Sequence, residues 1–231
     1  MKNLRNLTCT FFLSTALGLS AGDMTWTGGG GDELFATGAN WSDNVLPPSG
    51  SFVTMDKAGE VSSEGLPNGY LPARLIIRLK GNSILKASPV YRLDNTELTV
   101  GAGSGFSGGW IAFYDAKVTF ANNSSVNIQA WEQNGKNEFT FVIGQSGFEE
   151  ISAKSLYAKN LNDVTYIADL GAYKGDEKVI PLLVFKHVEN PFTEEEFHSS
   201  AVTDVSNPGI FTHSKICWNA EAKAIELRIA K

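Results

Sequence analysis

A short pattern recurs in the middle of this chain: Asn or Asp, two further residues, and then an apolar, a polar and an apolar residue. Clear copies begin at Asn95, Asp115 and Asn123, and a blurred copy lies at Gly81–Lys86. Asn and Asp tolerate the left-handed turn conformation and bond to their own backbone, so each copy predicts a corner followed by a strand. Stacked corners and strands form the coils of a β-solenoid. The intervals of 20 and 8 residues between copies indicate that a coil contains several strands.

Short strands separated by turns account for most of the remaining sequence, because β-branched and aromatic residues are frequent and several segments alternate with period two. A helix is expected at Thr193, where a capping residue precedes three glutamates. We predict an all-β fold, namely a right-handed β-helix or solenoid with an aromatic N-terminal cap. A β-sandwich is the alternative. The predicted strands are Leu75–Leu79, Glu97–Val100, Trp110–Tyr114, Lys117–Phe120, Ser125–Ile128, Phe139–Ile143, Val179–Phe185, Lys215–Trp218 and Ala224–Ile229.

The N-terminus has the parts of an export signal. Lys2 and Arg5 form a basic start, an apolar run follows over residues 7–19, and residues 20–22 are small. We therefore predict that residues 1–22 are a signal peptide and that the mature chain is periplasmic, cell-surface or extracellular, without insertion into a membrane.

The mature chain is expected to form one domain without disulfide bonds. Cys9 lies in the signal and leaves Cys217 without a cysteine partner, so stability must come from the core and from hydrogen bonds. The predicted β-solenoid domain, residues 23–231, consists of a cap motif at 23–56, rungs at 57–170 and a closing region at 171–231.

The acidic charge balance excludes some partners. The formal net charge is −6, and removal of Lys2 and Arg5 makes it −8. Nucleic-acid-binding proteins usually carry a clustered basic face, whereas the longest basic cluster here is Arg74, Arg78 and Lys80. We expect neither nucleic acid nor an anionic membrane as a partner.

The start of the expected mature chain has a distinctive series of aromatic and turn residues. It contains Trp26-Thr27-Gly28, Leu34-Phe35, Asn40-Trp41-Ser42 and Pro47-Pro48-Ser49-Gly50. This segment, Thr25 to Asp56, resembles the opening of secreted bacterial proteins of the autotransporter-associated β-strand-repeat type, although Phe35 stands where that family often has Trp. The resemblance implies a passenger-like surface or extracellular β-solenoid, in a family whose members mostly have no known activity.

Six aromatic residues are candidates for a cap or a binding site. Trp26, Phe35 and Trp41 are assigned to the cap, because an open solenoid end would expose strand edges and the apolar interior. Trp110, Tyr114 and Trp131 are the candidate ligand-binding residues, since Trp and Tyr stack on the apolar faces of sugar rings. Core packing is the alternative role for these three side chains.

No segment predicts a catalytic or metal site. The acids are scattered over turns, whereas a hydrolytic carboxylate pair lies about 5 to 9 Å apart. Gly103-Ser104-Gly105, in the glycine-rich stretch 101–109 that we expect to be a surface loop, leads into further loop and makes no nucleophile elbow. Glu194 and His198 would share a helix face, but further ligands such as His187 and His213 would have to converge from elsewhere. We predict no catalytic residues, no metal and no cofactor, and a structural thiol at Cys217.

These observations favour a non-catalytic secreted or surface-displayed protein with a structural or adhesion role. A carbohydrate-binding module is the first alternative, and a β-helix polysaccharide lyase or hydrolase is the second. The expected partner is a polysaccharide or a component of the cell envelope.

Overall fold

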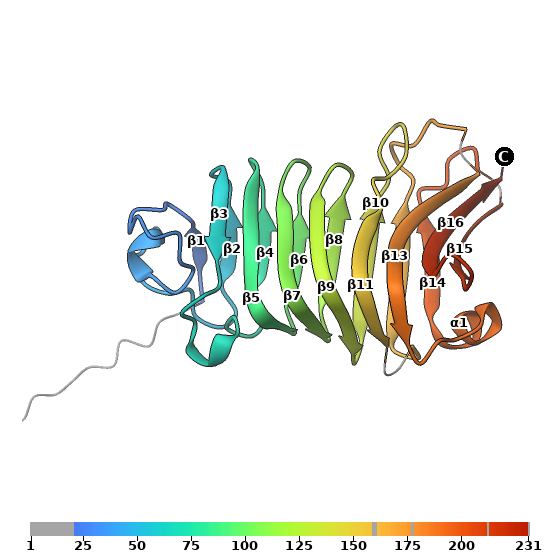
Figure 1. The fold of residues 1–231 in the computed structure, drawn as a ribbon. Coiled ribbons are helices and arrows are strands. Elements are labelled where there is room, and N and C mark those ends of the chain that lie inside the picture. Colours follow the sequence, from blue (N-terminus) through green and yellow to red (C-terminus); the bar gives the residue numbers. More distant parts are fainter. Residues whose placement is uncertain (1–20, 159–160, 177, 212, 231) are drawn as a thin grey trace, which may run out of the picture.

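The computed structural model describes residues 21–158, 161–176, 178–211 and 213–230 (Figure 1). The predicted signal peptide therefore lies outside the described residues, apart from Ala21 and Gly22. Within these residues the chain forms two eight-stranded sheets. Over residues 52–206, successive strands alternate between the sheets and pair in parallel with strands of the neighbouring coils, which makes the fold a β-solenoid. The alternative β-sandwich prediction is wrong.

The first sheet runs in the order β1-β2-β4-β6-β8-β10-β12-β14, and the second in the order β3-β5-β7-β9-β11-β13-β16-β15. The strands of the first sheet are β1 (Asp23–Thr25), β2 (Phe52–Met55), β4 (Ile76–Leu79), β6 (Glu97–Val100), β8 (Lys117–Ala121), β10 (Asn137–Val142), β12 (Val164–Asp169) and β14 (Val202–Ser206). Those of the second are β3 (Gly59–Ser62), β5 (Ser83–Asp94), β7 (Gly105–Tyr114), β9 (Ser125–Asn134), β11 (Ile151–Ala158), β13 (Val179–Glu189), β15 (His213–Asn219) and β16 (Ala224–Ala230).

The predicted corners lie where the chain passes between the two sheets. Their backbones have positive φ in two columns: Asn95, Asp115 and Gly135 form one column, and Asn82, Gly103 and Asn123 form the other. The backbone N–H of Asn95 donates to the backbone carbonyl of Tyr114 in the next coil, and the backbone N–H of Gly103 donates to the carbonyl of Asn123. The interval of 20 residues is therefore one coil, and the interval of 8 residues separates two corners of the same coil.

Inward-pointing side chains form one ladder on each sheet and together make up the core. Ile77, Leu98, Val118, Phe139 and Tyr166 succeed one another in register on the first sheet. Tyr91, Ile111, Trp131, Leu156 and Val188 do so on the second sheet. All ten are buried. Since alternate residues of a strand point to opposite faces, these ladders also identify which neighbours point outward.

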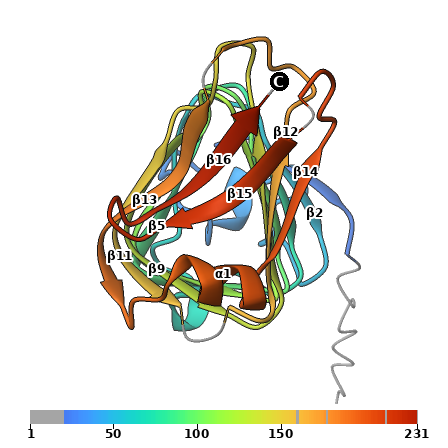
Figure 2. The ribbon, with the colours of Figure 1, turned by 90° about the vertical axis from the view of Figure 1, so that its right-hand side faces the viewer.

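The C-terminal end of the stack is crossed by an antiparallel hairpin and a short helix (Figure 2). β15 and β16 pair antiparallel, and β16 pairs antiparallel with β13. The helix α1 (Glu194–Ser200) begins with the predicted Thr193 cap, which together with Glu196 forms a capping box. Phe197 of α1 is fully buried, and the indole of Trp218 donates to the carbonyl of Phe192. Two 3-10 turns, η1 (Gly38–Asn40) and η2 (Pro67–Gly69), lie near the other end.

Two expectations about segment boundaries are corrected. The glycine-rich stretch 101–109 is only partly a loop, because β7 begins at Gly105 and Phe106 is buried in the core. A Cβ atom on Gly108 would lie 2.8 Å from the Cβ of Ala87, so these glycines permit close approach of neighbouring coils.

The parallel coils also continue beyond residue 170, the expected end of the rungs. β13 pairs in parallel with β11, and β14 pairs in parallel with β12. Antiparallel pairing begins only with the final hairpin. Among the described residues, no helix has the length and apolarity needed to span a membrane.

Candidate binding site on the second sheet

The outer surface of the second sheet carries a group of aromatic and polar side chains. Because Ile111 and Trp131 point inward, the residues on either side of them point outward. In register, Trp110 of β7 lies beside Ala130 of β9, and Ala112 lies beside Glu132.

Trp110 reaches across β9 to a tyrosine of β11. The rings of Trp110 and Tyr157 are stacked, with centroids 4.6 Å apart and planes at 20°. Ala130 of β9, the strand between β7 and β11, lies directly beside Trp110. Its small side chain leaves room for the indole to cross this strand. Trp110 remains 37% exposed, so Tyr157 fixes the ring without removing it from solvent.

Glu132 lies beneath this aromatic pair and is almost completely buried. Its Oε2 accepts a 2.6 Å hydrogen bond from Nε1 of Trp110, and its Oε1 accepts one of 2.6 Å from Nδ2 of Asn134. Burial of a carboxylate is costly unless it is hydrogen-bonded. These bonds therefore satisfy Glu132 and at the same time hold the indole and the amide in fixed orientations.

Tyr114 continues the surface along β7. The guanidinium of Arg92 lies 3.7 Å from the centroid of the Tyr114 ring and pairs with Asp94 at 3.0 Å. Tyr114 is next to Asp94 on one side and Asn134 on the other. We call the combined surface the Trp110 face; its members are Arg92, Trp110, Tyr114, Glu132, Asn134 and Tyr157.

The prediction that Trp131 binds a ligand at the surface is wrong. Trp131 is fully buried, and its ring lies 4.5 Å from that of Phe113 and 5.0 Å from that of Phe139. Its neighbours Ala130 and Glu132 occupy the outward positions. The structure thus separates the three candidates, with Trp110 and Tyr114 on one outer surface and Trp131 inside the core.

Sequence reasoning missed Glu132, Asn134, Tyr157 and Arg92 as members of this face. If Trp131 had been predicted to point into the core, Glu132 would have been predicted to point outward, because successive side chains of a strand point to opposite faces. Tyr157 could not be found in this way, because its position beside Glu132 depends on the register between β9 and β11.

The expected cap residues lie together at the other end of the chain. Trp26 and Trp41 meet edge-to-face with centroids 5.1 Å apart, and Phe35 meets Trp41 at 4.7 Å. The indole of Trp41 donates a 2.9 Å bond to the carbonyl of Phe35. All three are buried, so none presents a ring face to a ligand.

A polar network adjoins these aromatic residues. Asp32 accepts hydrogen bonds from the hydroxyl of Thr37 at 2.6 Å and from the amide of Asn40 at 2.7 Å, and it also accepts from the backbone of Leu34. The bond from Thr37, followed by the bond from Leu34, lowers the pKa of Asp32 below its ordinary value. The network orders the loop that carries Phe35 and Trp41.

No protein family, curated protein or solved structure that we compared with this chain matches it.

Proposed function

We propose that this chain is an exported, non-catalytic adhesion protein that attaches to polysaccharide through the Trp110 face. The observation that carries the proposal is the fixed aromatic pair above a hydrogen-bonded carboxylate, formed by Trp110, Tyr157 and Glu132. Export and surface display are supported by the basic and apolar start of the sequence and by the resemblance of residues 25–56 to passenger-like β-solenoids.

The chemistry of the Trp110 face suits a neutral sugar polymer. Indole and phenol rings stack on the apolar side of a pyranose, and polar groups nearby bond to its hydroxyls. Asn134 and Arg92 supply polar groups beside the rings, and the cation of Arg92 is balanced by Asp94. Pre-ordered side chains also lose little conformational entropy on binding, which favours the locked pair of Trp110 and Tyr157.

A non-catalytic role is supported by the state of Glu132. A general acid or nucleophile must reach its substrate, whereas both oxygens of Glu132 already accept short bonds from Trp110 and Asn134. Glu132 therefore acts as a support for the surface.

The test is a glycan array together with pulldown of cell-wall polysaccharide, using residues 23–231. Trp110→Ala and Tyr157→Ala are expected to abolish retention, while the melting temperature shows that both variants fold. The matched control is Tyr70→Ala, which removes a tyrosine that is 42% exposed outside this face.

Binding that persists in Trp110→Ala and Tyr157→Ala would overturn the proposed site. Release of soluble oligosaccharide from a bound polymer would instead identify a polysaccharide-cleaving enzyme. Absence of binding to any glycan, with retention of a protein component of the envelope, would exclude polysaccharide as the ligand.

A further inference from the structure

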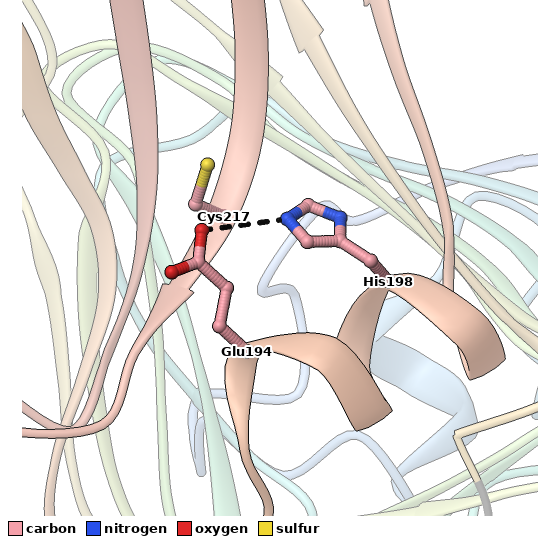
Figure 3. Close-up of side chains that lie close together, drawn as sticks. All are labelled: Glu194, His198 and Cys217. Carbon is pink, nitrogen blue, oxygen red and sulfur yellow. Dashed lines mark ion pairs between the residues drawn. The ribbon is translucent and has the colours of Figure 1, made fainter.

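The C-terminal end of the solenoid brings together three side chains with metal-binding chemistry. Glu194 and His198 lie one turn apart on α1, as the sequence predicts, and Cys217 of β15 lies beside them (Figure 3). One donor atom from each residue lies within 4.8 Å of the other two. The third donor is thus Cys217, and this group contains neither His187 nor His213.

The packing of α1 against β15 holds these donors in place. Phe197 is buried on the inner side of α1, and Trp218 is buried beside Cys217 on β15. The rings of Phe192 and Trp218 lie 4.5 Å apart. Both backbone segments are therefore held by their apolar neighbours, which keeps the three donors at the same end of the solenoid.

The distances are close to those of a tetrahedral zinc site. Zinc binds sulfur at about 2.3 Å and nitrogen or oxygen at about 2.0 to 2.2 Å, which puts adjacent ligand atoms about 3.3 to 3.8 Å apart. Nε2 of His198 and Oε1 of Glu194 are already 3.6 Å apart. The remaining separations are at most 4.8 Å, so these donor atoms must come closer by up to about 1 Å to reach that geometry.

The two cationic side chains near Glu194 interact with it only weakly, which leaves its carboxylate available to a metal ion. Its Oε1 lies 3.5 Å from Arg228 and 3.8 Å from Lys215. Charge-assisted hydrogen bonds are normally about 2.7 to 2.9 Å long, so these two pairs are loose. Burial raises the pKa of the Cys217 thiol, and Glu194 acts in the same direction, while Arg228 and Lys215 offset this rise only in part.

We propose that Glu194, His198 and Cys217 bind a zinc ion, with water as the fourth ligand. Zinc takes thiolate, imidazole and carboxylate ligands, and three protein ligands leave an open position. On binding, the Cys217 thiol gives its proton to solvent and a zinc–sulfur bond forms. The side chains of His198 and Glu194 are 36% and 43% exposed, which provides a route for the ion. The site joins α1 to β15 and is independent of sugar binding at the Trp110 face.

The experiment uses the full chain with Cys9→Ser, in which Cys217 is the remaining thiol. Cobalt is the spectroscopic probe, because a thiolate bound to cobalt gives an intense charge-transfer absorption. We expect this band to saturate at one equivalent of cobalt and to disappear when zinc is added. We also expect zinc to raise the melting temperature and a chelator to reverse that rise, because a ligand that binds only the folded state stabilises it.

Variants distinguish this site from unspecific metal binding. Cys217→Ser is expected to remove the cobalt–thiolate band, and His198→Gln, a change at a partly exposed position, is expected to weaken zinc binding at least tenfold. His187→Gln is the matched control, since His187 also faces a glutamate, at 3.3 Å, but is not part of the three-donor group. The proposal is overturned if cobalt gives no thiolate band, or if zinc stabilises His198→Gln and the parent protein equally.

Discussion

The hydroxyl of Tyr166 donates a 2.7 Å hydrogen bond to Oε1 of Gln133 in the interior of the solenoid. Tyr166 belongs to β12 of the first sheet and Gln133 to β9 of the second. Both side chains are fully buried, and burial raises the pKa of Tyr166 far above its ordinary value. The two sheets are thus joined by a polar contact inside a core made mostly of aliphatic and aromatic side chains.

Removing one partner of this bond should cost more than removing both. Tyr166→Phe leaves Oε1 of Gln133 buried without its donor, which costs about 1 to 3 kcal/mol. Adding Gln133→Leu should recover part of that loss, because Nε2 of Gln133 is itself buried without a partner. Urea denaturation of the two single variants and the double variant tests this. Tyr157→Phe, which removes a hydroxyl from the outer surface, should change the free energy of unfolding little. A loss of stability equal to that of Tyr166→Phe would show that the buried hydrogen bond to Gln133 is not the cause.

Trp41 is expected to be essential for the stability of the N-terminal end. Trp41→Ala removes a buried ring that contacts both Trp26 and Phe35, and such a truncation costs about 3 to 5 kcal/mol. Thermal unfolding should show a large decrease for Trp41→Ala and a smaller one for the partly exposed Trp110→Ala. An unchanged melting temperature in Trp41→Ala, together with lost ligand binding, would make this aromatic group a binding platform instead.

The corner at Asn123 should accept glycine and reject valine. Its φ is 61°, and a residue with a Cβ atom pays roughly 1 to 2 kcal/mol in this region, most severely when it is β-branched. Asn123→Gly should therefore preserve the free energy of unfolding, and Asn123→Val should lower it. Asn127→Val tests the same chemical change at an exposed position within β9. Equal losses at both positions would show that the corner conformation is not the cause.

The network around Asp32 should weaken in acid. The folded-state pKa of Asp32 lies below its unfolded value of 3.8, so its contribution to stability is complete above that pH and is lost as the pH falls through the folded pKa. The melting temperature of the parent should exceed that of Asp32→Asn at neutral pH, and the difference should shrink below about pH 4. Glu149→Gln controls for a general loss of surface charge. If the difference in melting temperature between the parent and Asp32→Asn stayed constant down to pH 2, the ionised carboxylate of Asp32 would not be its cause.

Local chemistry made the corners and many strands predictable. Asn95 and Asp115 have the backbone that their side chains favour, and β6 has the expected bounds, Glu97–Val100. The helix at Thr193 was likewise indicated by its capping residues. These features depend on neighbours in sequence, and so they could be inferred before any tertiary contact was known.

The functional surfaces depend on contacts between coils and were harder to predict. Trp110 and Trp131 look alike in sequence, but β7 and β9 place one outside and the other inside. Tyr157 meets Trp110 only because their strands are aligned across β9. Cys217 joins Glu194 and His198 because β15 crosses the end of the stack, which no spacing along the chain reveals.

The antiparallel hairpin also changes which strand edges the C-terminal end of the solenoid presents. A last coil left open would offer unpaired backbone groups to the first coil of another molecule, and repeated head-to-tail pairing of that kind builds filaments. Here β16 runs antiparallel to both of its neighbours, β13 and β15, and β15 packs against β14 and α1. The last parallel strand of the second sheet, β13, is therefore paired within the chain and does not offer its edge to another molecule.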